Sequence, residues 1–381
     1  MKPRPIWINR IEAAWAGRNV VWLSGVRRVG KTVLCQSLPE VEYFDCELPR
    51  TRRAMADPQA FLDGLKGKRV VLDEIHRLEH PSELLKIAAD HYPGLRIVAT
   101  GSSTLGASGK FRDTLAGRKT DIWLTPIIAA ELETFGHADL QHRALHGGLP
   151  PFFLADTPPE KDFHEWMDAF WARDIQELFR LERRASFQKF AELLLIHSGG
   201  MFEATRYATP CEVSRTTIAN YLAVLEATFA VHVLKPFSTR RASEIVSAPK
   251  VYGFDTGFVC YHRGWSRLRP EDLGILWEHL VLNEMHAHLQ TRNICYWRDK
   301  RRHEVDFVLP RRRGGPIAVE CNWSADSFEG RGLRAFRTAY PKGENYIVCQ
   351  DVARPFERDL NGVRVTFLAL DAFVETLREL A

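Results

Sequence analysis

The first third of the chain alternates short apolar runs with stretches in which apolar and polar residues are mixed. The apolar runs are rich in β-branched and aromatic residues, and they are Val20–Ser24, Tyr43–Cys46, Lys68–Leu72 and Arg96–Thr100. The mixed stretches have helical spacing and predict helices over Thr32–Leu38, Pro58–Leu65 and Ser82–His91. Strands that alternate with helices in this way form a parallel sheet covered on both faces, so the pattern predicts an α/β fold.

The middle of the chain is predominantly helical. After a break at Gly147–Pro151, aromatic residues recur at three- and four-residue spacing from Glu160 to about Leu181, which is typical of a helix packed into a core. Two more helices are predicted over Phe187–Ser198 and Ser214–Ala227, followed by a strand over Phe229–Leu234. This region therefore differs in type from the first third.

The last third mixes both kinds of pattern and predicts a second α/β domain. A helix is expected near Ile275–Leu289. The expected strands are Lys250–Phe254, Ile294–Trp297, Glu304–Leu309, Ile317–Glu320 and Asn345–Cys349.

Length and composition narrow the class of protein. The 381 residues, 45% hydrophobic, fit two or three globular domains rather than a disordered chain. No apolar run approaches the roughly 20 residues of a membrane span, and the N-terminus lacks the apolar core of a secretory signal. The 7 cysteines include no close pair, which excludes a disulfide scaffold or a CxxC zinc site and suits the cytoplasm.

Residues 25–32 carry the strongest chemical signal. They read GVRRVGKT, which fits GxxxxGK[ST] in full between a predicted strand and a predicted helix. Backbone N–H groups of such a loop surround phosphates, and the helix N-terminus adds positive charge. We expect Lys31 to reach the β- and γ-phosphates of ATP and Thr32 to hold Mg²⁺. The predicted nucleotide-binding residues are Gly25, Val26, Arg27, Arg28, Val29, Gly30, Lys31, Thr32, Val33 and Ser102.

Two further strand ends add to this site. The run VVLDE ends in Asp73, which would complete the Mg²⁺ shell, and Glu74, which would position or deprotonate the attacking water. In ATPases whose sheet has a strand inserted between the P-loop strand and the strand that ends in the acids, a polar residue on the inserted strand senses the γ-phosphate. Thr100 and Ser102 are the candidates, and a simple Gly/Ser turn is the alternative. Arg118 could stabilise transition-state charge within its own subunit or from a neighbour, or be a surface arginine.

With these motifs in place, the chain resembles the prokaryotic AAA+-type P-loop ATPases that carry a C-terminal domain of unknown function. The resemblance runs from near Trp7 to about Cys349. Its motifs are GVRRVGKT, VVLDEIHR, ATGSS, LAGR, HGGLP, WARDIQEL, PKVYGFDTG, LWEHLVLNE and the YWR…EVDFVL…AVE tract. It implies ATP hydrolysis at Lys31, Thr32, Asp73 and Glu74. It also implies an AAA+-type core over 1–140, a helical lid over 141–185, a winged-helix-like segment over 186–240 and a restriction-endonuclease-like domain over 241–381.

The winged-helix-like segment offers few groups for DNA. Ser214 is a plausible N-cap for its second helix. The residues that could reach base edges from this helix are Arg215, Thr216, Thr217 and Asn220. The helix is otherwise not basic, so we favour a structural or protein-contact role over DNA recognition.

The nuclease-like tract resembles the D…(E/D)xK core of metal-dependent nucleases. Asp306 and Glu320 at adjacent strand ends, with Glu278 as a third ligand, could hold a hard cation. Asn322 replaces the expected lysine, and an amide cannot supply its positive charge. Lys300 could take over that role, but we favour a degenerate fold that keeps the acids as structural groups.

The predicted function is a cytoplasmic Mg²⁺-dependent ATPase that drives or gates a step in a DNA-associated process. The net charge of +4 identifies no partner, but residues 292–313 hold eight basic residues against three acidic ones. DNA could bind this Arg298–Arg313 segment, where Tyr296 and Trp297 offer stacking. The alternative is that the segment is a solvated charged loop that binds no nucleic acid. The alternatives are a metal-dependent nuclease under ATPase control and a nucleotide switch for a protein partner. A homo-oligomer is expected if Arg118 serves a neighbour.

Overall fold

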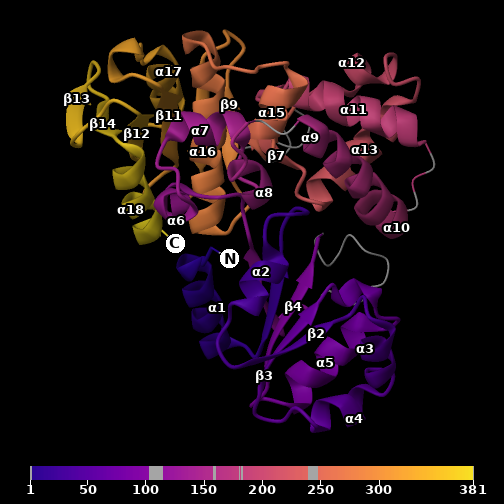
Figure 1. Cartoon of the computed structure of the whole chain (residues 1–381). Coiled ribbons are helices and arrows are strands. Elements are labelled where there is room, and N and C mark those ends of the chain that lie inside the picture. Colours follow the sequence, from indigo (N-terminus) through magenta and orange to yellow (C-terminus); the bar gives the residue numbers. More distant parts are fainter. Residues whose placement is uncertain are drawn as a thin grey trace.

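The computed structural model describes residues 2–102, 115–157, 160–179, 181, 183–238 and 248–380. These residues form two β-sheets with a helical region beside the second (Figure 1). The N-terminal sheet lies in the lower body of Figure 1, and the remaining two thirds of the chain form the upper body. None of the described helices is both long and apolar enough to cross a membrane.

The N-terminal sheet has five parallel strands in the order β2-β3-β4-β1-β5. Their bounds are Val20–Ser24 for β1, Val41–Asp45 for β2, Arg69–Asp73 for β3, Arg96–Gly101 for β4 and Lys119–Trp123 for β5. This confirms the four predicted strands and adds β5. Strand β4 lies between β1 and β3, so the carboxyl ends that carry the three motifs are neighbours at one edge.

Helices cover both faces of this sheet. They are α1 (Pro5–Gly17), α2 (Lys31–Gln36), α3 (Pro49–Ala54), α4 (Pro58–Asp63) and α5 (Pro81–His91). Val21 and Leu23 of β1 belong to the same buried cluster as α1, whereas Val20 and Trp22 belong to a second cluster with α4 and α5. Burial on both faces explains why the strands read as continuous apolar runs.

The middle region is helical, as predicted. Its elements are η3 (Ala129–Glu131), α6 (Leu132–Phe135), α7 (Leu140–His146), α8 (Pro150–Phe153), α9 (Glu160–Ala169), α10 (Gln176–Phe179), α11 (Arg184–Ile196), α12 (Ala204–Ala208) and α13 (Arg215–Ala227). A π-helical turn over Phe170–Ile175 joins α9 to α10. Ser214 caps α13, since its hydroxyl accepts a hydrogen bond from the N–H of Thr217 at 3.1 Å.

The second sheet has nine strands in the order β13-β14-β12-β11-β10-β9-β7-β8-β6. Their bounds are Gly200–Met201 (β6), Val231–Pro236 (β7), Lys250–Gly253 (β8), Cys295–Arg298 (β9), Glu304–Leu309 (β10), Ile317–Asn322 (β11), Asn345–Cys349 (β12), Phe356–Asp359 (β13) and Arg364–Leu368 (β14). The helices that accompany it are α15 (Thr256–His262), α16 (Pro270–Leu289), α17 (Arg331–Ala339) and α18 (Leu370–Leu380).

The nine-stranded sheet includes the strand that was expected at the end of the winged-helix-like segment. Strand β7 pairs with β8 in antiparallel fashion and with β9 in parallel fashion. The antiparallel β7–β8 pair has the arrangement of a two-stranded wing, and β7 also joins this pair to the large C-terminal sheet, so the winged-helix-like segment stays a prediction. The predicted boundary between 186–240 and 241–381 falls within one continuous sheet.

The C-terminal end of α16 is fixed to the N-terminal domain by polar contacts. The side chain of Gln290 accepts from the backbone N–H of Trp123 at 2.8 Å and donates to its carbonyl oxygen at 3.1 Å. Glu284 accepts a hydrogen bond from the N–H of Ala129 at 2.6 Å. Gln290 thus satisfies backbone groups at the end of β5, next to the end of the strand that leads into residues 25–32.

Candidate active site

The GVRRVGKT loop follows β1 and leads into α2. Its turn requires left-handed backbone at Gly25, Arg28 and Gly30, with φ of 150°, 63° and 102°. A Cβ atom on Gly25 would lie 2.4 Å from the carbonyl oxygen of Leu124. Only glycine fits this position, which explains the first fixed residue of the motif.

Lys31 lies inside the curve of this loop. Its side chain is only 6% exposed, and its ammonium donates to the carbonyl oxygens of Gly25 at 2.8 Å and Val26 at 3.2 Å. Burial lowers the pKa of Lys31, although the carboxylates of Glu74 and Asp174 oppose this shift. The predicted phosphate-binding cation is therefore at the centre of the loop.

Asp73 is the point where three hydroxyl groups meet. Its carboxylate accepts hydrogen bonds from Thr32 at 2.8 Å, from Thr100 at 2.5 Å and from Tyr43 at 2.5 Å. The adjacent hydroxyl of Thr32 and carboxylate of Asp73 are the hard oxygen ligands that Mg²⁺ takes when it also binds substrate phosphates. These residues fit a magnesium ion. Tyr43 was not predicted, because a tyrosine near the end of a strand has no distinctive sequence signal.

Glu74 is held in a left-handed backbone conformation, with φ 52° and ψ 46°. Its N–H donates to the hydroxyl of Thr100 at 2.9 Å, and its carboxylate lies 3.2 Å from Nδ1 of His76. Burial alone would raise the pKa of Glu74, but the hydrogen bond with His76 and the charge of Lys31 lower it to about 2. Strain of this kind is concentrated at functional sites. Thr100 thus positions both acids.

Two adjoining cavities, of about 520 and 260 Å³, are lined in part by residues of the loop. The larger is lined by Lys31 and Ser102, and the smaller by Asp73 and Tyr43. The residues that line both are Arg27, Thr32, Glu74 and Arg173. Arg173 belongs to the π-helical turn of the middle region, in the WARDIQEL motif, and it contacts Glu47 at 3.5 Å. No sequence motif predicts a role for Arg173, because its position at these cavities depends on packing between distant segments.

The N-terminal segment contacts the loop through Arg4. Arg4 donates to both carboxylate oxygens of Glu131 at 2.7 Å and to the carbonyl oxygen of Val29 at 3.0 Å. Arg4 and Glu131 are 3% and 2% exposed. No motif marks this pair, because its members are 127 residues apart.

Arg118 does not reach the predicted nucleotide site of its own chain, which corrects the expectation that it could act within its own subunit. It immediately precedes β5, whose first residue, Lys119, is level with Val20 at the start of β1. The loop follows the other end of β1, about 13 Å further along the strands. Arg118 instead pairs with Asp90 at 2.7 Å.

The structure brings the three acids of the nuclease-like tract together around an unexpected lysine. Lys250 of β8 contacts Glu304 at 2.5 Å and Glu278 at 3.8 Å, and it is about 6% exposed. Although burial opposes it, the charges of Glu278 and Asp306 raise the pKa of Lys250. Lys300, the lysine considered from sequence, is exposed on the loop after β9.

Two of the carboxylates that were expected to bind metal accept hydrogen bonds from the protein itself. Tyr252 donates to Glu278 at 2.6 Å, and the N–H of Cys321 donates to Asp306 at 2.9 Å. Burial and the charge of Asp306 raise the pKa of Glu278 to about 8. The same two causes raise the pKa of Glu320 well above its usual range. Among the described residues, no group of three His, Cys, Asp or Glu side chains could hold a metal ion. The predicted second metal site at Glu278, Asp306 and Glu320 is therefore not supported.

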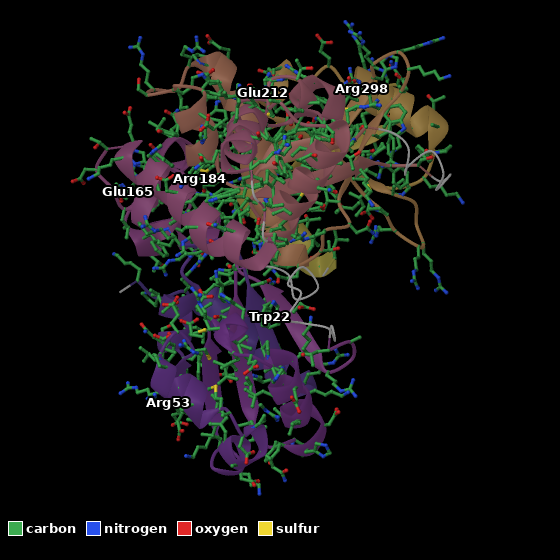
Figure 2. All side chains as sticks on the ribbon, turned by 90° about the vertical axis from the view of Figure 1, so that its right-hand side faces the viewer. Trp22, Arg53, Glu165, Arg184, Glu212 and Arg298 are labelled. Carbon is green, nitrogen blue, oxygen red and sulfur yellow. The ribbon has the colours of Figure 1, made fainter. Side chains whose placement is uncertain are left out.

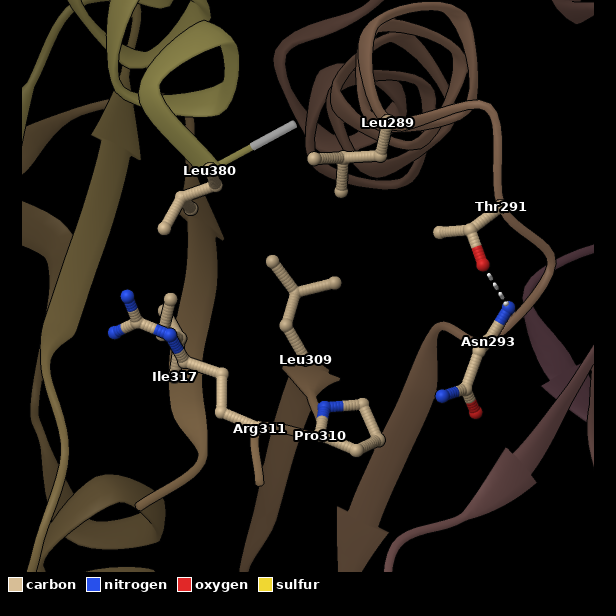
Figure 3. Close-up of a pocket in the computed structure, with 8 residues that line it drawn as sticks. All are labelled: Leu289, Thr291, Asn293, Leu309, Pro310, Arg311, Ile317 and Leu380. Atoms are coloured by element: carbon tan, nitrogen blue, oxygen red, sulfur yellow. Dashed lines mark hydrogen bonds between the residues drawn. The ribbon is translucent and has the colours of Figure 1, made fainter. Parts of the chain in front are cut away.

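A separate cavity of about 220 Å³ lies between α16, α18 and the adjoining ends of β10 and β11 (Figure 3). Leu289, Leu309 and Leu380 extend toward it, and its charged residue, Arg311, pairs with Glu344 at 3.1 Å. It carries no constellation for catalysis.

The basic segment is divided in space. Arg298 and the exposed residues 300–302 precede β10, whereas residues 311–313 follow it, so strand β10 separates the two groups by about 17 Å. Figure 2 shows Arg298 on the upper body, far from Arg53 on α3. Tyr296 and Trp297 are buried, so they cannot stack on bases as the sequence suggested.

Comparison with protein families divides the chain into three matched regions. Residues 17–133 match the model of an AAA domain, and residues 273–369 match a domain of unknown function (DUF4143). Between them, residues 137–269 match another domain of unknown function (DUF8612).

Similar whole proteins and structures are also found. Uncharacterized proteins of Mycobacterium tuberculosis and Mycobacterium bovis are each 29% identical over 339 residues, covering 86% of this chain and 75% of theirs. A Walker-type ATPase of Pyrococcus abyssi matches 69% of this chain and 96% of its own, at 15% identity and a TM-score of 0.46. A STAND protein with a tetratricopeptide repeat sensor from Pyrococcus horikoshii matches 74% of this chain and 46% of its own, at 11% identity and a TM-score of 0.25.

Proposed function

We infer that this chain, an AAA-type P-loop protein with a C-terminal domain of unknown function, binds ATP with Mg²⁺ and hydrolyses it. The observation that carries the proposal is the hydrogen bond between Thr32 and Asp73, directly beside Lys31 and Glu74. It joins the start of α2 to the end of β3. A phosphate-binding loop, a pair of magnesium ligands and a general base therefore come to one edge of the sheet.

The proposed roles follow from the chemistry of each group. The N–H groups of residues 25–32 and the ammonium of Lys31 bind the phosphates. Thr32 and Asp73 hold Mg²⁺, which when bound neutralises charge on the phosphate oxygens. Glu74 is ionised at neutral pH and orients the attacking water, and Thr100 fixes the backbone from which Glu74 extends. Arg173 is placed to offer a cation to the phosphates from the middle region.

Phosphate release with ATP and Mg²⁺ tests this function. Wild-type protein should turn over ATP, Glu74→Gln should bind ATP without turnover, and Lys31→Ala should lose binding. A wild-type protein that neither binds nor hydrolyses ATP would refute the proposal.

A coupling to DNA is the second part of the proposal. Two exposed basic groups, at residues 298–302 and 311–313, and the exposed N-terminal face of α13 at Arg215 and Asn220 support it. Phosphate contacts by such residues make binding depend strongly on salt. Turnover should rise with added duplex DNA, and binding should weaken steeply from 50 to 200 mM salt. Unchanged turnover together with salt-independent binding would remove DNA from the function.

Arg118 is proposed to act only between subunits. Because it lies at the opposite edge of its own sheet, it could complete only a neighbour's nucleotide site. If it does, Arg118→Ala lowers turnover in a homo-oligomer. A chain that sediments as a monomer while hydrolysing ATP would exclude this role.

A further inference from the structure

The segment Trp166–Asp174 of the middle region lies against the GVRRVGKT loop. The indole N–H of Trp166 donates to the carbonyl oxygen of Arg27 at 3.1 Å. The carboxylate of Asp174 lies 3.5 Å from the guanidinium of the same Arg27. Both Trp166 and Asp174 are almost completely buried, at 1% and 2% exposed. Because the AAA domain match ends at residue 133, both contacts come from outside that domain.

Asp174 lies among residues that the sequence predicts to bind the nucleotide, which are Arg27, Lys31 and Ser102. It forms a hydrogen bond with Ser102 and an ion pair with Arg27, and Lys31 is close enough to lower its pKa. The net effect is nevertheless a raised pKa, because burial of the Asp174 carboxyl dominates. A carboxylate and a phosphate are both oxyanions that use the same cationic donors. They also repel each other strongly in a poorly solvated site.

The backbone at Asp174 departs from regular α-helical geometry. Asp174 is part of the π-helical turn Phe170–Ile175, and such turns are frequent at functional sites. Arg173, the preceding residue, lines both cavities of the nucleotide site. A displacement of Asp174 would therefore also change the position of Arg173.

We propose that Asp174 is an autoinhibitory contact: its carboxylate competes with the phosphates of ATP for Arg27 and Ser102. Phosphate binding displaces Asp174 and thereby changes the conformation of the Trp166–Asp174 segment. The conformation of the middle region then depends on whether nucleotide is bound. This inference rests on the proposed function, because it takes residues 25–32 as the ATP site.

ATP affinity of the Asp174→Asn variant tests the competition. Asparagine keeps the shape of the side chain and removes its charge. Isothermal titration with ATP and Mg²⁺ at 4 °C should give a Kd at least about threefold lower than wild type. The same change at Asp168, a half-buried residue of α9 that pairs with Arg184, should leave Kd unchanged. In an Arg27→Ala background, Asp174→Asn should give much less gain, because the shared partner is gone.

Hydrogen exchange gives a second measurement that does not depend on a variant. A non-hydrolysable ATP analogue should speed exchange in peptides that cover residues 160–175 of the wild-type protein. Unchanged exchange, or an Asp174→Asn variant that binds ATP no more tightly than wild type, would overturn the inference. In either case Lys31-dependent ATP binding by the wild type would leave the proposed function standing. A wild type that binds no ATP refutes the proposed function and this inference with it.

Discussion

Breaking the buried pair between Arg4 and Glu131 should strongly destabilise the N-terminal domain. Two hydrogen bonds of 2.7 Å join the side chains, and both are at most 3% exposed. Glu131→Gln places an amide against the guanidinium and leaves the Arg4 charge buried without a counter-ion. Removing one partner of such a pair costs about 3–5 kcal/mol. We therefore expect a loss of this size in urea unfolding followed by circular dichroism.

The chain contains a matched control for this prediction. The pair between Arg118 and Asp90 has the same 2.7 Å separation, but its side chains are 36% and 35% exposed. Exposed pairs contribute little because solvent screens them, so Asp90→Asn should leave the urea midpoint within experimental error. The reasoning is refuted if both variants shift the midpoint equally, since burial would then not decide the energy. Because Arg4 also binds the carbonyl oxygen of Val29, Glu131→Gln should in addition weaken ATP binding.

Four further outcomes are expected of the nucleotide site. Glu74→Gln should lower turnover about 10²-fold or more while ATP still protects against thermal unfolding, as differential scanning fluorimetry can show. The pKa of Glu74 is lowered to about 2, so its carboxylate is charged above that pH, and turnover assays should find no loss with a midpoint between pH 4 and 7 that is due to Glu74. Arg173→Ala should lower kcat by at least tenfold in steady-state kinetics, and an unchanged kcat would remove Arg173 from the site. Gly25→Ala should abolish ATP binding in equilibrium titration, because the added Cβ meets the Leu124 carbonyl at 2.4 Å.

The part of the site that sequence predicts is the part built from contiguous residues. A phosphate loop uses backbone N–H groups of one short segment, so its spacing is visible as GVRRVGKT, and the strand-end acids Asp73 and Glu74 follow a similar local rule. The remaining contacts join residues that are far apart in the chain. Lys250 lies among Glu278, Glu304 and Asp306 only because β8 enters the same sheet as β10. No spacing rule could have chosen it over Lys300, which is closer in sequence.

The same long-range contacts explain how a nucleotide site could act on the rest of the molecule. Asp174 and Trp166 touch the loop in front, and Gln290 of the C-terminal region holds Trp123 at the end of β5. Strand β5 pairs with β1, and β1 leads into the loop. The two outer regions therefore contact the AAA domain at one edge of its sheet, where the phosphates are expected. A conformational change at the phosphates can therefore reach the middle region and the C-terminal region through direct contacts. Arg118 lies at the opposite ends of the strands and, among the described residues, has no such contact with the nucleotide site of its own chain.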